Sequence, residues 1–306
     1  EGIFQTGSIA SLWVNTESKK KPPAITGVVI KKKDDRLWMA LESDELPEWT
    51  DDGKLGLDLY YDERTYDEME KAVREVMQAS GNRLAELRGI LLGHRKAGLH
   101  QAMAAVTLPD LNATQNEALN LVARAEDVAA IHGPPGTGKT TTLVRTIAHT
   151  LKREKQVLVC AASNLAVDLL TEKHAQAGVR VLRLGHPARV SEDVLRHSMD
   201  VQVALHPAFQ EMKNYRRDAE KIRTKALKFK RQFGKAERAE RRAMLDEAKD
   251  CQRQARRLEQ FITKDLIDKA EAITCTLAGS AGRMLAGRQF STLFIDEAAQ
   301  ALEPSC

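Results

Sequence analysis

Residues 133–140 are GPPGTGKT, so three glycines precede a Lys-Thr pair. Glycines let successive backbone N–H groups turn inward around a phosphate, and a helix that starts behind them adds partial positive charge. The apolar run 128–131 and the helical pattern 141–151 predict a strand before this loop and a helix after it, as a phosphate-binding loop requires. We therefore expect ATP here, with Lys139 at the β and γ phosphates and the Thr140 hydroxyl on Mg²⁺. The ATP-binding residues predicted from this segment are Gly133, Pro134, Pro135, Gly136, Thr137, Gly138, Lys139, Thr140 and Thr141.

Two adjacent carboxylates, Asp296 and Glu297, follow the apolar run 293–295. The carboxyl ends of parallel strands face the ligand crevice of an α/β sheet, so both side chains are expected near the phosphate-binding loop. Asp296 would hold Mg²⁺, directly or through water, and Glu297 would orient and deprotonate the attacking water. The carboxylate pair alone is weak evidence, but together with the loop and Lys139 it predicts ATP hydrolysis.

A polar segment, residues 111–117, comes shortly before the phosphate-binding loop. Thr114 and Glu117 have the spacing of a helix-capping box, which would explain these two residues by local structure alone. The box leaves Gln115 unexplained, and the amide of Gln115 can both donate to and accept from the edge of an adenine. The spacing leaves both interpretations open: an ordinary helix start, or an adenine site at Gln115.

The composition is that of a globular protein that forms a core. The chain has 306 residues, of which 42% are hydrophobic and 29% charged, so two domains are expected. Its apolar runs are too short to cross a bilayer, and its first residues lack the pattern of a signal peptide, so we expect no membrane partner. The four cysteines lack metal-ligand spacing, which favours a reducing compartment, the cytoplasm or possible nuclear location in a eukaryote.

Residues 1–62 predict a small β-barrel. Apolar runs at 9–14, 25–30 and 37–41, with alternating leucines at 55–59, are typical of short strands, and the charged segment 31–36 suits a hairpin tip. An irregular N-terminal extension is the alternative.

Residues 63–107 predict a helical stalk. Thr65 and Glu68 have the spacing of a capped helix start, residues 80–82 interrupt the helical pattern, and residues 84–92 resume it. The stalk would link the barrel to the next domain.

Residues 108–306 predict an α/β domain. Apolar runs at 128–131, 157–160, 179–184, 272–275 and 293–295 alternate with helical segments, as in a parallel sheet covered on both faces.

Within this domain, residues 206–268 contain two apolar series spaced by three or four with Gly234 between them, which predicts an inserted α-helical hairpin. Residues 206–265 carry 18 Lys and Arg against 10 Asp and Glu, while the whole chain has a net charge of only +4. This surplus suits a phosphate backbone, although a charged hairpin is also typical of a solvated arm.

These segments resemble the up-frameshift-like branch of superfamily 1B helicases. Residues 111–115 resemble its Q motif, residues 133–140 its motif I, residues 162–168 its motif Ia, and residues 296–301 its DExxQ-box motif II. Residues 183–189 and 301–303 fit the immunoglobulin mu-binding protein type of this branch. The resemblance is dense from 108 onward, where it implies a RecA-like P-loop NTPase sheet, and is only architectural before that.

The resemblance implies an ATP-dependent helicase or translocase that moves 5′ to 3′ on single-stranded DNA or RNA, with ATP and Mg²⁺ bound. It implies that Gln115 binds adenine and that Gln300 couples the nucleotide site to movement. It also implies that Ser163, Asn164 and Thr276 contact the nucleic-acid strand. A monomer is the simplest expectation.

The resemblance places motif III and a second RecA-like domain, with its arginine fingers, after Cys306. We therefore expect the chain to bind ATP weakly at best and to hydrolyse it slowly.

Two alternatives are a P-loop ATPase that remodels nucleoprotein without unwinding, and a non-catalytic nucleic-acid-binding module. The phosphate-binding loop disfavours the second alternative. The match to motif Ia, and the resemblance of residues 274–277 to motif Ic, favour a helicase over the first. DNA and RNA are not distinguished, because backbone contacts carry no sequence information.

Overall fold

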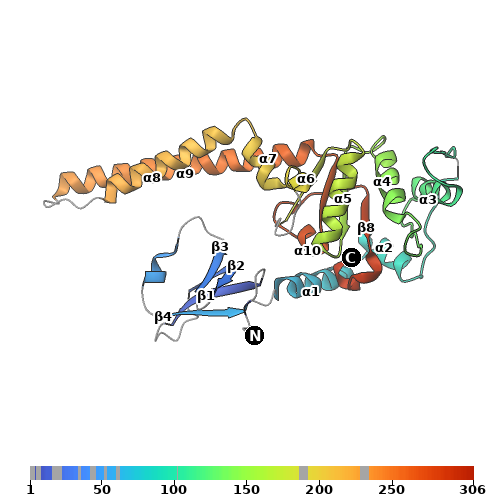
Figure 1. Ribbon diagram of the computed structural model, residues 1–306, viewed down its shortest axis with the longest axis horizontal. Helices are drawn as coiled ribbons and strands as arrows, with labels where there is room; N and C mark the ends of the chain where they lie inside the picture. Colours follow the sequence, from blue (N-terminus) through green and yellow to red (C-terminus); the bar gives the residue numbers. More distant parts are fainter. Residues whose placement is uncertain are drawn as a thin grey trace. The chain divides into compact units, whose positions relative to one another are not determined.

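The computed structural model is of mixed α/β class and consists of two compact units, Glu1–Arg74 and Glu75–Cys306 (Figure 1). It describes residues 4, 8–15, 23–33, 36–41, 46–51, 54–59, 63–101, 103–185, 192–227 and 234–306. In this part of the chain, no helix is both long and apolar enough to cross a membrane.

The first unit contains a four-stranded antiparallel sheet with the order β3-β2-β1-β4. Its elements are β1 (Ile9–Asn15), β2 (Ala24–Lys33), β3 (Arg36–Leu41), η1 (Glu48–Asp51) and β4 (Lys54–Leu59). Ala10, Val14 and Val29 form its buried centre. The four predicted strands are confirmed, and β2 and β3 extend into the charged segment as far as Lys33 and Arg36. Residues 34–35 of the predicted hairpin tip lie outside the described residues. Closure of this sheet into a barrel stays a prediction.

Helices α1 (Glu63–Gln78) and α2 (Arg83–Leu91) follow the antiparallel sheet along the chain. The predicted capping box at Thr65 and Glu68 is wrong, because α1 begins at Glu63 and Thr65 lies inside its first turn. The predicted break between the helices is confirmed. Asn82 caps α2 by accepting a hydrogen bond from the backbone N–H of Ala85 at 3.0 Å.

The second unit is built on a four-stranded parallel sheet with the order β6-β7-β5-β8. The strands are β5 (Val157–Ala161), β6 (Val181–Arg183), β7 (Ala272–Thr276) and β8 (Leu293–Asp296). The predicted strand at residues 128–131 is wrong, since this segment forms no ladder with the sheet. Two of its four residues are alanines, which have low strand propensity and little apolar surface to bury, and Ile131 is 38% exposed.

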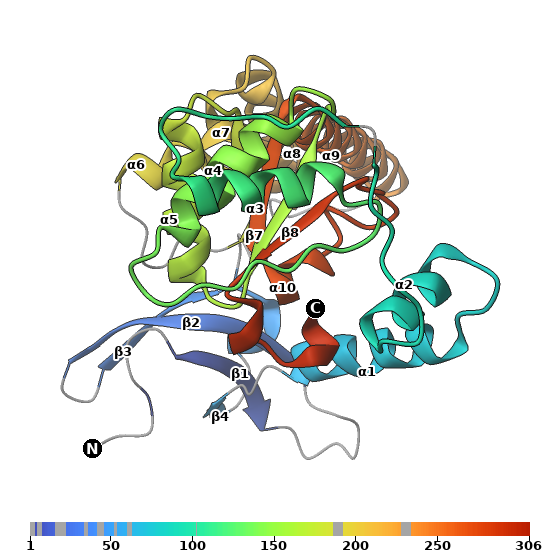
Figure 2. The same cartoon turned by 90° about the vertical axis from the view of Figure 1, so that its right-hand side faces the viewer.

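Alternate residues of the parallel sheet pack against helices on opposite faces, as the strand period requires. Val157 and Val159 of β5 pack against Ile147 of α4 (Lys139–Thr150) and Leu170 of α5 (Asn164–Gln176), the helices drawn in front of the sheet in Figure 2. The remaining helices before the hairpin are α3 (Ala113–Arg124), α6 (Glu192–Leu195) and α7 (Met199–Leu205).

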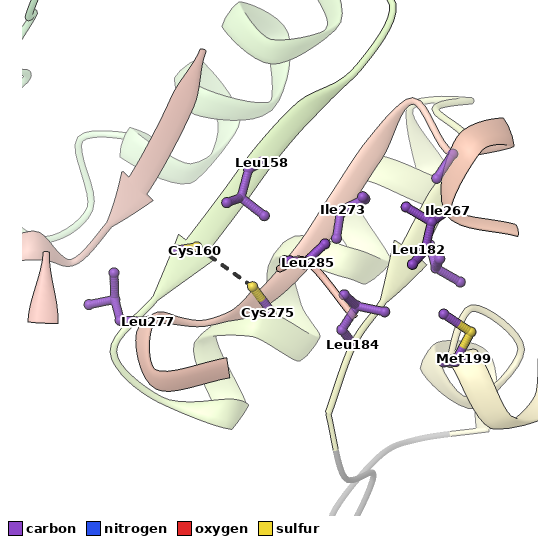
Figure 3. Packing of buried hydrophobic residues seen from close by; sticks show 11 residues of the cluster. Leu158, Cys160, Leu182, Leu184, Met199, Ile267, Ile273, Cys275, Leu277 and Leu285 are labelled. Carbon is purple, nitrogen blue, oxygen red and sulfur yellow. Dashed lines mark hydrogen bonds between the residues drawn. The ribbon is translucent and has the colours of Figure 1, made fainter. Parts of the chain in front are cut away.

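The opposite face of the parallel sheet has a core of its own, drawn in Figure 3. Leu158 of β5 and Ile273 of β7 pack there with Met199 of α7. Cys160 and Cys275 are register partners on adjacent strands, with their sulfurs 3.7 Å apart as free thiols. The segments that follow β7 and β8 are α10 (Leu277–Ser280), η2 (Ala298–Gln300) and η3 (Glu303–Ser305).

The predicted helical hairpin is present as α8 (Phe209–Leu227) and α9 (Lys235–Lys269), and it projects from the parallel-sheet region in Figure 1. The buried seam between the helices consists mainly of small residues: Met212, Ala219 and Ala226 on α8, and Ala248, Ala255 and Ile262 on α9. Two aromatic residues predicted on this seam, Phe229 and Phe233, lie outside the described residues.

Candidate nucleotide and nucleic-acid site

The phosphate-binding loop ends at the first residue of α4. Gly136 and Gly138 have φ angles of 83° and 81°, in the left-handed region that glycine adopts readily. A Cβ atom at Gly138 would lie 2.6 Å from Nε2 of Gln115, so a side chain there would displace the Gln115 amide. Within the loop, the Thr137 hydroxyl donates to the carbonyl oxygen of Pro134 at 2.9 Å. The loop is thus shaped mainly by its own backbone.

Lys139 opens α4 and reaches back across the loop. Its Nζ donates to the carbonyl oxygens of Gly133 at 2.8 Å and Pro134 at 3.4 Å. Thr140 follows as a half-buried residue, while Pro135 and Thr141 are exposed. An ammonium held over the loop carbonyls is well placed to exchange these partners for phosphate oxygens.

Gln115 lies against this loop, but the local reason for its position differs from the prediction. The capping box of α3 is formed by Asn112 and Gln115, each side chain accepting a hydrogen bond from the other's backbone N–H at 2.9–3.0 Å. The predicted box at Thr114 and Glu117 is therefore wrong. Nε2 of Gln115 also donates to the carbonyl oxygen of Thr137 at 3.0 Å, which ties α3 to the loop.

Asp296 and Glu297 lie where β8 ends. Asp296 is the last residue of the strand, and Glu297 turns into the left-handed region with a φ angle of 52°. The backbone N–H of Glu297 donates to Oδ1 of Asp296 at 3.0 Å, and Nε2 of Gln300 donates to Oε2 of Glu297 at 3.0 Å. The three polar residues of this motif are thus linked by hydrogen bonds.

Burial raises the pKa of Asp296 above its ordinary value, and repulsion from Glu297 adds to this effect. The backbone N–H of Glu297 and the charge of Lys139 act in the opposite direction. The loop lysine therefore contributes to the electrostatics of the strand-end carboxylate.

The ends of three neighbouring strands are level. Ala161 of β5 is the register partner of both Thr276 on β7 and Asp296 on β8. Adjacent strands are about 4.8 Å apart, so Thr276 and Asp296 lie roughly 10 Å from each other along one edge. Residues expected at the nucleotide and residues expected at the nucleic-acid strand therefore share one edge of the sheet.

Ser163 and Thr276 both cap helices at this edge. The hydroxyl of Ser163 accepts from the backbone N–H of Ala166 at 3.2 Å at the start of α5. The hydroxyl of Thr276 accepts from the backbone N–H of Gly279 at 3.0 Å at the start of α10. Each hydroxyl keeps its own proton available to donate, since a hydroxyl both donates and accepts.

Arg183 is a residue of the candidate site that the sequence analysis did not predict. It is fully buried at the end of β6, and its Nε donates to Oδ1 of Asp168 on α5 at 2.9 Å. Its Nη2 donates to Oδ1 of Asn164 at 2.9 Å. A sequence signal existed: residues 164, 168 and 171 are polar at one-turn spacings on a helix that packs on the sheet, and an arginine interrupts an apolar strand.

Thr140 and Asp296 offer a hydroxyl and a carboxylate, the hard oxygen donors that Mg²⁺ prefers. Within the described ranges, no group of three His, Cys, Asp or Glu side chains could hold a metal ion. Mg²⁺ usually binds through one or two protein oxygens together with phosphates and waters. The donors present therefore fit this ion in company with a nucleotide.

Comparisons with known proteins match the whole chain. The family described as AAA domain matches residues 110–306. DNA polymerase alpha-associated DNA helicase A of Schizosaccharomyces pombe is 31% identical over 99% of this chain and 46% of its own length. ATP-dependent helicase upf1 of the same species is 33% identical over 94% of this chain and 30% of its own length. The chain belongs to the up-frameshift-like family of superfamily 1B helicases.

A further member of this helicase family, DNA-binding protein SMUBP-2 of Rattus norvegicus, is 30% identical over 99% of the chain and 31% of its own length. The chain thus spans less than half the length of these relatives. A phosphate-binding loop inside the matched AAA domain implies that this helicase-family chain binds a nucleotide.

Proposed function

We propose that the chain is the N-terminal portion of an ATP-dependent helicase or translocase that couples ATP hydrolysis to 5′–3′ movement on single-stranded nucleic acid. In this proposal residues 1–62 form a small β-barrel, residues 63–107 a stalk, and residues 108–306 the first RecA-like domain with its insertion at 206–268. Relatives whose names describe DNA helicases and a DNA-binding protein favour DNA as the strand.

The observation that carries this proposal is the level row of strand ends at Thr276, Ala161 and Asp296. It places a candidate nucleic-acid contact and a candidate magnesium ligand roughly 10 Å apart on one sheet edge. Such proximity suits a coupled motor, because hydrolysis at one site has to change the contacts at the other.

The nucleotide is bound mainly by the phosphate-binding loop and the first turn of α4. Backbone N–H groups of the loop surround the phosphates, and Lys139 exchanges its two carbonyl partners for phosphate oxygens. Gln115 binds the adenine edge while its capping box keeps α3 against the loop. Thr140 and Asp296 would hold Mg²⁺, which would neutralise charge on the phosphates.

Glu297 accepts a proton from the attacking water. Its backbone is left-handed directly after β8, and Gln300 fixes one of its carboxylate oxygens by a 3.0 Å hydrogen bond. The other oxygen remains available for the water. A change at the nucleotide that moves Glu297 would also move Gln300, which is how we propose that Gln300 takes part in coupling.

The single strand is bound by the side chains of Ser163, Asn164 and Thr276. Ser163 and Asn164 lie just after β5, and Thr276 is the last residue of β7. The basic hairpin α8–α9 is a second candidate surface for phosphates. Some of its charge is already paired, for example Arg216 with Glu259 at 2.9 Å.

The proposal is tested by measuring binding of a fluorescent ATP analogue and ATP turnover, with and without oligothymidine or oligouridine single strands. We expect weak nucleotide binding and slow turnover by the 306-residue chain, as the resemblance implies, and this slow turnover should rise when a single strand is added. Glu297→Gln should keep analogue binding and lose turnover, because only the proton acceptor is removed.

The matched control is Glu303→Gln, since Glu303 is an exposed carboxylate in the same C-terminal segment. It should leave both measurements unchanged. Full turnover in Glu297→Gln would remove Glu297 as the base. If no single strand changes the rate of ATP turnover, the result would favour the nucleoprotein-remodelling switch over a translocase.

A further inference from the structure

We propose that Arg183 is a positioning residue for single-strand binding: it holds the side-chain oxygen of Asn164, so that Nδ2 of Asn164 faces outward and donates to a backbone phosphate. This inference rests on the proposed function, because it assumes that Asn164 contacts the strand. It adds a buried residue that touches neither nucleotide nor nucleic acid.

The guanidinium of Arg183 is completely buried and has three separate acceptors. Nε binds Oδ1 of Asp168 at 2.9 Å, Nη1 binds the carbonyl oxygen of Leu184 at 3.2 Å, and Nη2 binds Oδ1 of Asn164 at 2.9 Å. A guanidinium can only donate hydrogen bonds. The atom of Asn164 that faces Arg183 therefore has to be its oxygen.

Asn164 itself is an exposed residue at the first position of α5. Because its oxygen is turned toward Arg183, its NH₂ group is the end left to interact with a ligand. Among the described residues, no hydrogen-bond partner accepts from this NH₂ group. An outward NH₂ suits an anionic phosphate, whereas an outward carbonyl oxygen would be repelled by it.

The local geometry keeps this arrangement in place. Asn164 and Asp168 are one helical turn apart on α5, so one guanidinium on β6 reaches both. The carboxylate supplies the countercharge that a buried arginine needs. Gly185, with a φ angle of 112°, leads the chain away from the strand, and a Cβ atom there would lie 2.9 Å from Nη1 of Arg183.

A double-mutant cycle on the 306-residue chain tests the proposal. Anisotropy of a labelled oligothymidine strand gives the dissociation constants of wild type, Asn164→Ala, Arg183→Lys and the double variant. A lysine keeps the charge beside Asp168 but lacks the fork that also reaches Asn164. Each single change should weaken binding about tenfold, as expected for one charge-assisted hydrogen bond. The double variant should bind as weakly as either single variant.

A purely structural contribution from Arg183 gives a different result. The two losses would then multiply to about a hundredfold in the double variant, and this outcome would overturn the proposal. Arg180→Lys is the matched control, because Arg180 lies three residues earlier and pairs with Glu271 at an exposed site. It should leave the dissociation constant unchanged.

Asn164→Asp keeps the inference testable if Arg183→Lys fails to fold. The new carboxylate still accepts from Arg183, so the buried pair is preserved, but an oxygen now faces outward. If Arg183 holds the side chain in place, this oxygen repels the phosphate and binding is weaker than in Asn164→Ala. Equal losses in the two variants would mean that the side chain is not held, which contradicts the proposal.

The outcomes also separate this inference from the proposed function. If the chain binds single strands and Asn164→Ala has no effect, the positioning proposal fails while the ATP and strand-stimulation measurements still decide the function. If the chain binds no single strand and its ATP turnover is unaffected by one, the proposed function fails first, and this inference fails with it.

Discussion

The phosphate-binding loop and the junction of α5 with β6 belong to the same compact unit, but different interactions hold them. Among the described residues, Lys139 bonds only to carbonyl oxygens of its own loop, and the preceding residues 128–131 form no ladder with the sheet. Arg183, in contrast, joins a strand to a helix through a buried ion pair with Asp168. Nearby sites can therefore differ greatly in how firmly the fold holds them.

The difference matches what each site has to do. A loop that wraps phosphates has to exchange its own hydrogen bonds for those of the nucleotide, so weak local bonds are an advantage. An amide that has to present one particular atom benefits from being fixed before the ligand arrives. The comparison predicts that mutations at the junction affect stability most, whereas mutations in the loop affect binding most.

The largest effect on stability is expected for Arg183→Met. It leaves the carboxylate of Asp168 buried without its partner, which should lower the free energy of unfolding by about 3–5 kcal/mol. Arg180→Met is the control, because Arg180 is 72% exposed and its pair with Glu271 should contribute no more than about 1 kcal/mol. Denaturant unfolding of both variants measures the difference. Equal losses in the free energy of unfolding would show that the junction of α5 with β6 is not held by the buried ion pair.

Lys139→Ala should show the reverse pattern. The affinity for an ATP analogue should fall about tenfold or more, because charge-assisted bonds to phosphate are lost. The free energy of unfolding should change by less than about 1 kcal/mol, since only bonds within the loop disappear. Lys152→Ala, at an exposed lysine beyond the end of α4, should change neither quantity. If Lys139→Ala destabilises the chain as strongly as Arg183→Met, the loop is not held locally.

Gln115 is expected to affect both stability and nucleotide binding, since it caps α3 and also donates a hydrogen bond to the loop. Gln115→Ala removes both functions and should lower the free energy of unfolding by about 1 kcal/mol. Gln115→Glu keeps an oxygen for the backbone N–H of Asn112 but cannot donate to the carbonyl oxygen of Thr137. It should cost less stability and still weaken analogue binding. Identical stability losses would assign the whole effect to the loop contact.

The smallest effect is expected for Asp296→Asn. Because the pKa of Asp296 is raised in the folded chain, the folded state keeps this proton to higher pH than the unfolded state. The group's contribution to stability is therefore lost as pH rises from its ordinary pKa of 3.8 through the folded value. Asp296→Asn should raise Tm by a few degrees at most at neutral pH, and the difference should vanish below pH 3.8. Thermal scans across this range that show a lower Tm in the variant would contradict the shift.

Strands with continuous β-branched and apolar residues could be predicted from the sequence. The runs that became β5 and β7 are buried along nearly their whole length, and their composition alone indicated this. The predicted strand at residues 128–131 was wrong because two alanines between a valine and an isoleucine resemble such a run but bury much less surface. The helix start at α3 misled for another reason: both Asn112 and Thr114 are good caps, and Gln115 and Glu117 complete either box equally well.

The candidate site was predictable where the chemistry is local in the chain. The loop at 133–140 and the pair of carboxylates at the end of β8 can each be recognised from adjacent residues. The partners of Arg183 lie 15 and 19 residues earlier on another element. They meet only because the sheet order brings β6 under α5, and strand order cannot be obtained from the periodicity of a single strand.

Helix α9 has a mechanical consequence. It runs without interruption through 35 residues and ends two residues before β7, while Ile267 near its base is packed in the core of the sheet. At 1.5 Å per residue it forms a rigid arm about 50 Å long. A rotation of about 5° at the base would displace the far end by roughly 4 Å. Small rearrangements at the sheet edge would thus be magnified at the tip of this arm, where a distance probe could record them.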